Sequence, residues 1–167
     1  DALAVVGKKD GVDQLGLAAR ELGDERDDEF VLGQTIERDI APLEVVVFNI
    51  GANVNFPIRE TTERVYRKVW EMAALGGFLA GREAAKVMVP RGKGTIIFTG
   101  ATASMRGGSG FSAFAGAKFA LRALAQSMAR ELGPEGIHVA HTIIDGAIDT
   151  EWIAKNFPQR YALKEQG

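Results

Sequence analysis

The sequence has no cysteine, no long apolar run and little net charge, and each absence excludes a class of function. A chain of 167 residues without cysteine has no disulfides, thiolate metal sites or thiol nucleophiles, which is typical of a reducing cytosol. No stretch approaches the roughly 20 apolar residues of a membrane-spanning helix. The formal charge of −2 argues against the concentrated basic surface of a nucleic-acid-binding protein. The first residues form no basic-then-apolar leader, so we expect a cytoplasmic protein that binds neither membranes nor nucleic acids.

Glycine is abundant, with 20 residues, and short apolar runs alternate with stretches of helical periodicity. The predicted strands are Leu3–Val6, Val45–Phe48, Thr95–Thr99 and Ile137–Ile144. The predicted helices cover 12–22, the stretch that follows an acidic patch at 24–29 and ends at about Asp39, 61–89 and 112–132. Alternation of this kind predicts parallel pairing and right-handed crossovers, hence one open, doubly wound α/β domain over residues 1–167 with helices on both faces of the sheet.

The ends of the predicted strands carry small and polar residues. They are Gly7-Lys8-Lys9, the segment 49–53, the segment 99–102 and Asp145-Gly146-Ala147. Sheets of this class bind ligands beyond the carboxyl ends of their strands, and glycine there lets a flat ligand lie against the backbone. One such glycine could simply end a strand, whereas four together favour a groove of nucleotide size.

The helix start at 111–118 is the most informative segment. Phe114 and Lys118 are four residues apart, so they share one face of the helix. A lysine among alanine, glycine and phenylalanine is either a snorkelling surface residue or a buried cation held for a ligand. The spacing alone leaves both interpretations open.

These motifs resemble those of the short-chain dehydrogenase/reductase family, whose members bind a nicotinamide cofactor on a Rossmann-like sheet. Asn49-Ile50-Gly51-Ala52 looks like the family's Asn-Asn-Ala-Gly after its fourth strand. Phe111–Leu121 and Met128–Val139 are similar to its catalytic helix and sixth strand. The segment Asp145–Thr150 is similar to the Pro-Gly-x-x-x-Thr that touches the carboxamide. The resemblance covers nearly the whole chain and implies a three-layer αβα Rossmann-like fold.

The resemblance places the catalytic positions at Lys118, Phe114, Ala101 and Thr102, but only the lysine is retained. Phe114 stands where the family has its tyrosine, Ala101 where it has serine, and Ala73 where it has asparagine. Carbonyl reduction needs a proton donor, which phenylalanine lacks. Three nearby hydroxyls could replace it, those of Thr102, Ser104 and Ser112.

Three functions therefore stay open. The first is an NADP(H)-linked oxidoreductase with an atypical proton relay, acting on a small hydrophobic carbonyl or alcohol. The second is a non-catalytic nucleotide-binding or interaction subunit with a degenerate active site. The third is an enzyme that uses the groove for non-redox chemistry. Met105, Phe111 and Trp152 are the residues that indicate an apolar substrate lining.

Cofactor choice is predicted from the lysines that follow the first strand, which resembles the family's second. Basic residues there pair with a 2′-phosphate, so Gly7, Lys8 and Lys9 predict NADP(H), and NAD is the alternative if both lysines are ordinary solvated charges. The resemblance implies further cofactor contacts at Asp24, Asn49, Gly51, Ala52, Lys118, Gly146, Ile148 and Thr150. No metal is expected, because His138 and His141 lie three apart on a strand and point to opposite faces.

Two expectations concern the whole protein. The family's Gly-x-x-x-Gly-x-Gly turn, its third strand and its C-terminal end are not found, so we expect these residues to be part of a longer chain, with an intact mass above 17.9 kDa. We also expect a homodimer or homotetramer, because helices 61–89 and 112–132 carry extra apolar side chains. These are Val65, Val69, Phe78, Leu79 and Val87 on one helix and Leu121, Leu124 and Met128 on the other, which could instead fill the core.

Overall fold

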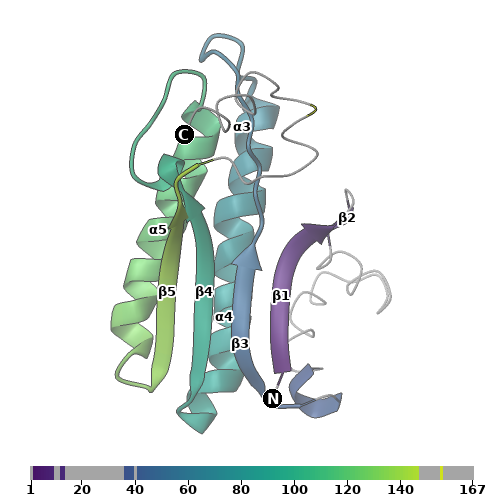
Figure 1. The fold of residues 1–167 in the computed structure, drawn as a ribbon, viewed down its shortest axis with the longest axis vertical. Coiled ribbons are helices and arrows are strands. Elements are labelled where there is room, and N and C mark those ends of the chain that lie inside the picture. Colours follow the sequence, from purple (N-terminus) through teal and green to yellow (C-terminus); the bar gives the residue numbers. More distant parts are fainter. Residues whose placement is uncertain (1, 10–11, 14–35, 40, 147–154, 156–167) are drawn as a thin grey trace.

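A computed structural model describes residues 2–9, 12–13, 36–39, 41–146 and 155. Five strands form one sheet in the order β2-β1-β3-β4-β5 (Figure 1). The strands are β1 Ala2–Lys9, β2 Val12–Asp13, β3 Leu43–Asn49, β4 Gly94–Ala101 and β5 Ile137–Ile144. β1, β3, β4 and β5 run parallel, and β2 pairs antiparallel with β1. The predicted parallel α/β sheet is confirmed.

The predicted helices 61–89 and 112–132 are also confirmed. The first is one continuous helical run of α3 Glu63–Trp70, the π-helical turn η2 Glu71–Leu75, α4 Gly76–Met88 and the 3₁₀ turn η3 Val89–Arg91. Thr62 caps its start, because its Oγ1 accepts a hydrogen bond from the Val65 amide at 3.2 Å. A second 3₁₀ turn, η4 Thr102–Ser104, follows β4, and α5 covers Ser112–Leu132.

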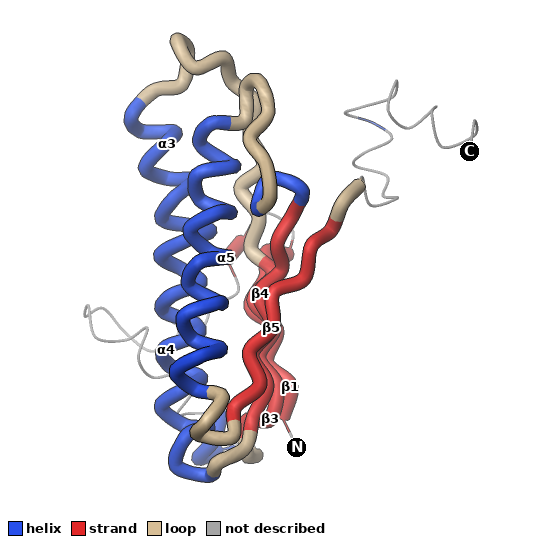
Figure 2. Tube along the Cα trace, turned by 90° about the vertical axis from the view of Figure 1, so that its left-hand side faces the viewer, coloured by secondary structure: helices blue, strands red, loops and turns tan. Residues whose placement is uncertain are grey.

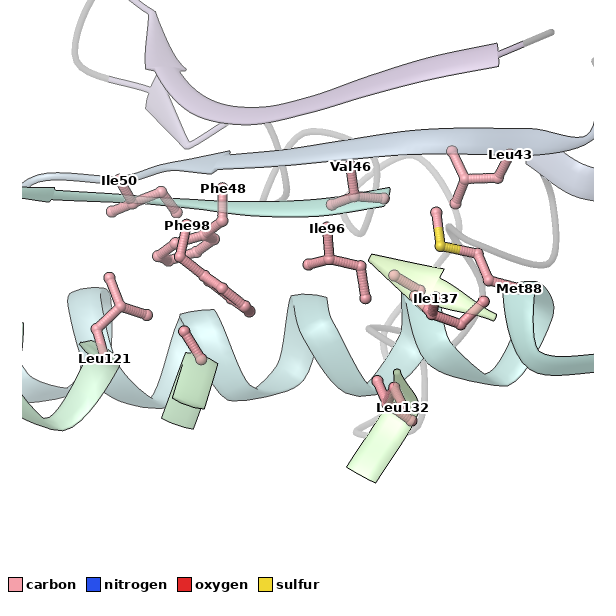
Figure 3. Close-up of a cluster of buried hydrophobic side chains, with 12 residues drawn as sticks. Leu43, Val46, Phe48, Ile50, Met88, Ile96, Phe98, Leu121, Leu132 and Ile137 are labelled. Atoms are coloured by element: carbon pink, nitrogen blue, oxygen red, sulfur yellow. The ribbon is translucent and has the colours of Figure 1, made fainter. Parts of the chain in front are cut away.

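The described helices α3, α4 and α5 lie together on one face of the sheet (Figure 2). Between them and the strands, Phe48 and Phe98 are fully buried with ring centroids 6.1 Å apart (Figure 3). Gly77 and Gly81 bring α4 close to this core. A Cβ at Gly77 would lie 2.3 Å from Leu121 Cδ1, and one at Gly81 would lie 2.9 Å from Phe98 Cζ. The glycines therefore set the spacing between helix and sheet.

The N-terminal strand lies elsewhere in the sheet than expected. β1 pairs directly with β3, with Val6 opposite Phe48 and Gly7 opposite Asn49. In the doubly wound order the strand beside the fourth is the first, so the assignment of β1 to the family's second strand does not agree with the sheet. β1 takes this place because its pairing with β3 satisfies the backbone N–H and C=O groups along that edge of β3.

The expected helix 12–22 is wrong at its start, because Val12 and Asp13 form β2 opposite Lys9 and Lys8. Valine has restricted χ1 rotamers and favours strands. The helix prediction used apolar periodicity alone and did not include this preference. Residues 14–22 lie outside the described part, as do the acidic patch with Asp24 and most of the helix predicted after it. Of that helix, residues 36–39 are helical as expected.

Candidate functional site

The carboxyl ends of four parallel strands meet at one edge of the sheet (Figure 1). In the paired strands Phe48 lies beside Phe98, and Phe98 lies beside His141. The residues after these positions therefore lie at similar heights along the sheet. The turn η4 and the first half of α5 lie beside this edge and pack against each other. The expectation that the glycine-bearing strand ends gather in one place is thus confirmed for the described strands.

Lys118 is buried rather than snorkelling, with 3% of its surface exposed. Its Nζ donates hydrogen bonds to two carbonyl oxygens, that of Thr99 near the end of β4 at 2.9 Å and that of Ile50 directly after β3 at 3.1 Å. Burial lowers the pKa of Lys118 from 10.5 to about 8, because the charged ammonium loses its hydration. An ammonium has three donors, and described residues accept from two of them.

Small residues on α5 allow the helix to deliver Lys118 to the strands. Ala113 and Ala117 are buried against Val69 and Ala73 of the preceding helical run. Ala73, the residue at the family's asparagine position, lies in the π-helical turn η2 and is fully buried. Turns of this kind occur frequently at functional sites, and here the turn faces the helix that carries Lys118.

Phe114 and Ala101 bring no proton donor to the site. The Phe114 ring is buried, and its centroid lies 5.8 Å from Lys118 Nζ. Ala101 ends β4, and its amide donates to the Ser104 hydroxyl at 3.1 Å. Ser104 is completely buried, so its hydroxyl stabilises the η4 turn rather than facing a ligand.

The other two hydroxyls differ in their surroundings. Ser112 Oγ is buried without a hydrogen-bond partner among the described residues, beside a hollow of about 370 Å³ lined by residues 57–59 and 108–110. Thr102 Oγ1 donates instead to Asp145 Oδ1. The pairing of Ala101 with Ile144 brings these two residues together, because each follows its strand by one position. Asp145 is exposed, and sequence reasoning assigned it no chemistry of its own, although it directly follows a strand at the ligand-binding edge.

His141 lies on β5 against the β4 backbone. A Cβ at Gly100 would lie 2.2 Å from its Cε1, so only glycine leaves room for the imidazole. Its Nε2 is buried without a partner among the described residues. Burial lowers the pKa of His141, and the positive charges of Lys118 and Arg122 add to this effect. In the described part of the chain, no cluster of three or more His, Asp or Glu side chains could hold a metal ion.

The remaining predicted cofactor positions leave room for a flat ligand. A Cβ on Gly51 or on Gly146 would meet nothing within 4 Å, and Asn49 is exposed. Ala52 packs against the α3–α5 cluster instead. Gly7, Lys8 and Lys9 are the last three residues of β1, so their backbone reaches the same edge. Open backbone at Gly51 and Gly146 thus leaves space for a flat group at this edge of the sheet.

Several predicted positions lie outside the described residues, namely Asp24, Ile148, Thr150 and Trp152. Of the expected substrate lining, Met105 is 46% exposed and Phe111 is half-buried. No helix in the described ranges has both the length and the apolarity to cross a bilayer.

Comparisons with known proteins agree with this fold. A family model described as short chain dehydrogenase matches residues 21–160. A (21S)-21-acetoxyl-apo-melianone synthase from Melia azedarach is 36% identical over 99 residues, which cover 58% of this chain and 36% of that protein. The chain thus spans about a third of the length of this curated relative.

Two solved structures extend the comparison. A short-chain dehydrogenase from Rhodopseudomonas palustris is 59% identical, with a TM-score of 0.67 over 81% of this chain and 63% of that one. ElxO with NADP bound has a TM-score of 0.72 over 80% of this chain and 54% of its own, at 20% identity, which is a likeness of fold. Both support the Rossmann-like architecture expected from the sequence.

Proposed function

The chain belongs to the short-chain dehydrogenase/reductase family, and from this premise we propose that it transfers a hydride between NADP(H) and a small hydrophobic carbonyl or alcohol. The observation that carries the proposal is the buried Lys118 ammonium, which donates to two backbone carbonyls near the strand ends and has a third N–H that no described residue accepts. A buried cation costs free energy, so its presence at the ligand-binding edge favours a role in ligand binding. We expect this activity in the cytoplasm.

The cofactor would supply the hydride, and this chain's residues would hold and orient it. The third donor of Lys118, which no residue in the described part of the chain accepts, could bind the hydroxyls of the nicotinamide ribose. Gly51 and Gly146 leave open backbone on which a flat ring can lie. Met105, which is 46% exposed beyond β4, offers the apolar surface for a modest hydrophobic substrate.

A preference for NADP(H) over NAD(H) is supported by charge: Lys8 and Lys9 end β1 at the ligand-binding edge, where positive charge would favour the additional 2′-phosphate. Because β1 pairs with β3, this support no longer comes from a match to the family's second strand. ElxO, a neighbour of similar fold, holds NADP. The test is fluorescence titration of the purified protein with NADPH and with NADH. Replacing Lys8 or Lys9 by Asp should weaken NADPH binding by about tenfold or more, since the favourable charge is lost. Equal affinity for both cofactors, unchanged in the variants, would contradict the preference.

One observation favours a second function, a nucleotide-binding subunit without catalysis. Phe114 offers no hydroxyl to Lys118, and Ala101 offers none to a substrate oxygen. Tight NADPH binding, with no turnover across a panel of carbonyls and alcohols, would identify such a subunit.

We also propose that the protein forms a homodimer or homotetramer through α3, α4 and α5. Four aromatic side chains on these helices are between 42% and 45% exposed, namely Tyr66, Trp70, Phe78 and Phe119. Of the residues expected at this face, Phe78 is exposed, whereas Val69 and Leu121 are buried in the chain's own core. Light scattering that gives a monomer at micromolar concentration would contradict this assembly.

A further inference from the structure

The hydrogen bond between Thr102 and Asp145 gives the site a proton acceptor that neither Phe114 nor Ala101 can provide. We propose that Thr102 and Asp145 form a relay that removes the hydroxyl proton of an alcohol, so that the site oxidises alcohols by nicotinamide-dependent dehydrogenation. This inference rests on the proposed function, and it names the substrate class and the direction of that reaction.

Thr102 and Asp145 lie at the ligand-binding edge of the sheet. Lys118 Nζ is bound to the carbonyl of Thr99, and Thr102 follows three residues later, where β4 ends and η4 begins. η4 packs against α5, the helix that carries Phe114 and Lys118. Asp145 follows the neighbouring strand at the same height. The pair therefore lies at the sheet edge where Lys118 and the open glycine backbone also lie.

Thr102 is better placed for proton transfer than Ser104 and Ser112. The Ser104 hydroxyl is fully buried and accepts the Ala101 amide. The Ser112 hydroxyl is buried without a partner in the described part of the chain, so nothing there could take up its proton. Thr102 is partly exposed and already donates to a carboxylate. Its oxygen keeps lone pairs with which to accept a hydrogen bond from an alcohol.

Each proton and each electron pair of the proposed reaction has a stated acceptor. The alcohol O–H proton passes to Thr102 Oγ1 while the threonine proton passes to Asp145 Oδ1, which becomes a neutral carboxylic acid. The C–H bond of the same carbon breaks, and its hydride, with both electrons, reduces an oxidised nicotinamide cofactor. A carbonyl product remains. Because Asp145 is exposed, its proton can leave to water.

The direction follows from the hydrogen bond as the structure holds it. Thr102 Oγ1 already donates its proton to Asp145 Oδ1, so the pair is arranged to receive a further proton from an alcohol. Alcohol oxidation is therefore the direction that the relay serves.

The experiment uses the purified full chain, NADP⁺ and NAD⁺, and a panel of aliphatic, alicyclic and aromatic secondary alcohols. NADPH or NADH formation gives kcat and KM, and fluorescence titration gives the cofactor Kd. Asp145→Asn keeps the size of the side chain but removes the base, and Thr102→Val removes the hydroxyl. Each should lower kcat by about 100-fold or more, the usual contribution of a general base, with the cofactor Kd unchanged.

Two further variants separate a relay from a structural contact. Thr102→Ser retains a hydroxyl and should restore most of the rate lost in Thr102→Val. The double variant Thr102→Val/Asp145→Asn should be no slower than the slower single variant, because the two residues act as one unit. Glu63→Gln, on the exposed start of α3, removes a carboxylate remote from the site and serves as the control.

The outcomes distinguish the relay from the function on which it rests. If the cofactor binds and Asp145→Asn keeps the wild-type kcat, the relay is wrong and the proposed oxidoreductase stands. If the cofactor binds and the wild-type protein oxidises no alcohol of the panel, the relay is also wrong. If neither cofactor binds, the proposed function fails and the relay fails with it.

Discussion

Replacement of Lys118 by methionine tests whether the site holds a desolvated ammonium. Methionine has a similar length and no charge, and Lys118 is 3% exposed, so the substitution exchanges one buried side chain for another. Burial lowers the pKa of Lys118 from 10.5 to about 8 in the folded protein. At pH values between 8 and 10.5, the Lys118 side chain is therefore protonated in the unfolded chain and neutral in the folded chain.

The sign and size of the effect follow from proton linkage. Because the unfolded state binds more protons between pH 8 and pH 10.5, the free energy of unfolding rises with pH in this window. Below pH 8 both states are protonated, and the full penalty for the buried charge is present. One pKa unit corresponds to about 1.4 kcal/mol, so wild type should gain about 2–3 kcal/mol relative to Lys118→Met between pH 7 and pH 10.

The assay is urea unfolding followed by tryptophan fluorescence at pH 7, 8, 9 and 10, on wild type and on Lys118→Met. Groups that titrate in both proteins cancel in the difference between them. Lys93→Met, which removes an exposed lysine paired with Glu44, controls for the loss of one positive charge. If the difference between wild type and Lys118→Met is the same at pH 7 and pH 10, Lys118 is not a desolvated cation and the reasoning is refuted.

Three other predictions follow from the same region and its core. Phe114→Tyr combined with Ala101→Ser should raise carbonyl reduction by about 100-fold or more, because it restores a proton donor beside Lys118; an NADPH-consumption assay that shows no gain would mean that more than the relay is missing. Wild type should lose stability as the pH falls below about 6.5, because the lowered pKa of His141 makes the unfolded state bind more protons than the folded state. His141→Leu should remove this loss, which urea midpoints at pH 5 and pH 7 measure. Gly77→Ala should destabilise the fold by about 1–3 kcal/mol, because its Cβ would lie 2.3 Å from Leu121 Cδ1. Gly107→Ala is the matched control, since a Cβ there would meet nothing within 4 Å. Equal thermal midpoints for the two variants would contradict the packing argument.

The sequence by itself determined the local elements that support the site. Helical periodicity bounded by Gly133 and Pro134 predicted α5, and β-branched runs predicted β3, β4 and β5. The spacing of Phe114 and Lys118 put them on one helix face, and the loss of a phenol at 114 followed from the residue type. Such features depend on neighbours within a few positions, so they can be read along the chain.

Only the tertiary structure decided which distant groups meet. Whether Lys118 is buried depends on the carbonyls of Ile50 and Thr99, which are 68 and 19 residues away. Thr102 finds Asp145, 43 residues later, because β4 and β5 pair in register to their last residues. The pairing of β1 with β3 likewise reflects which strand edge is open in the folded sheet. Strand order and register arise from contacts distant in sequence, and no local pattern records them.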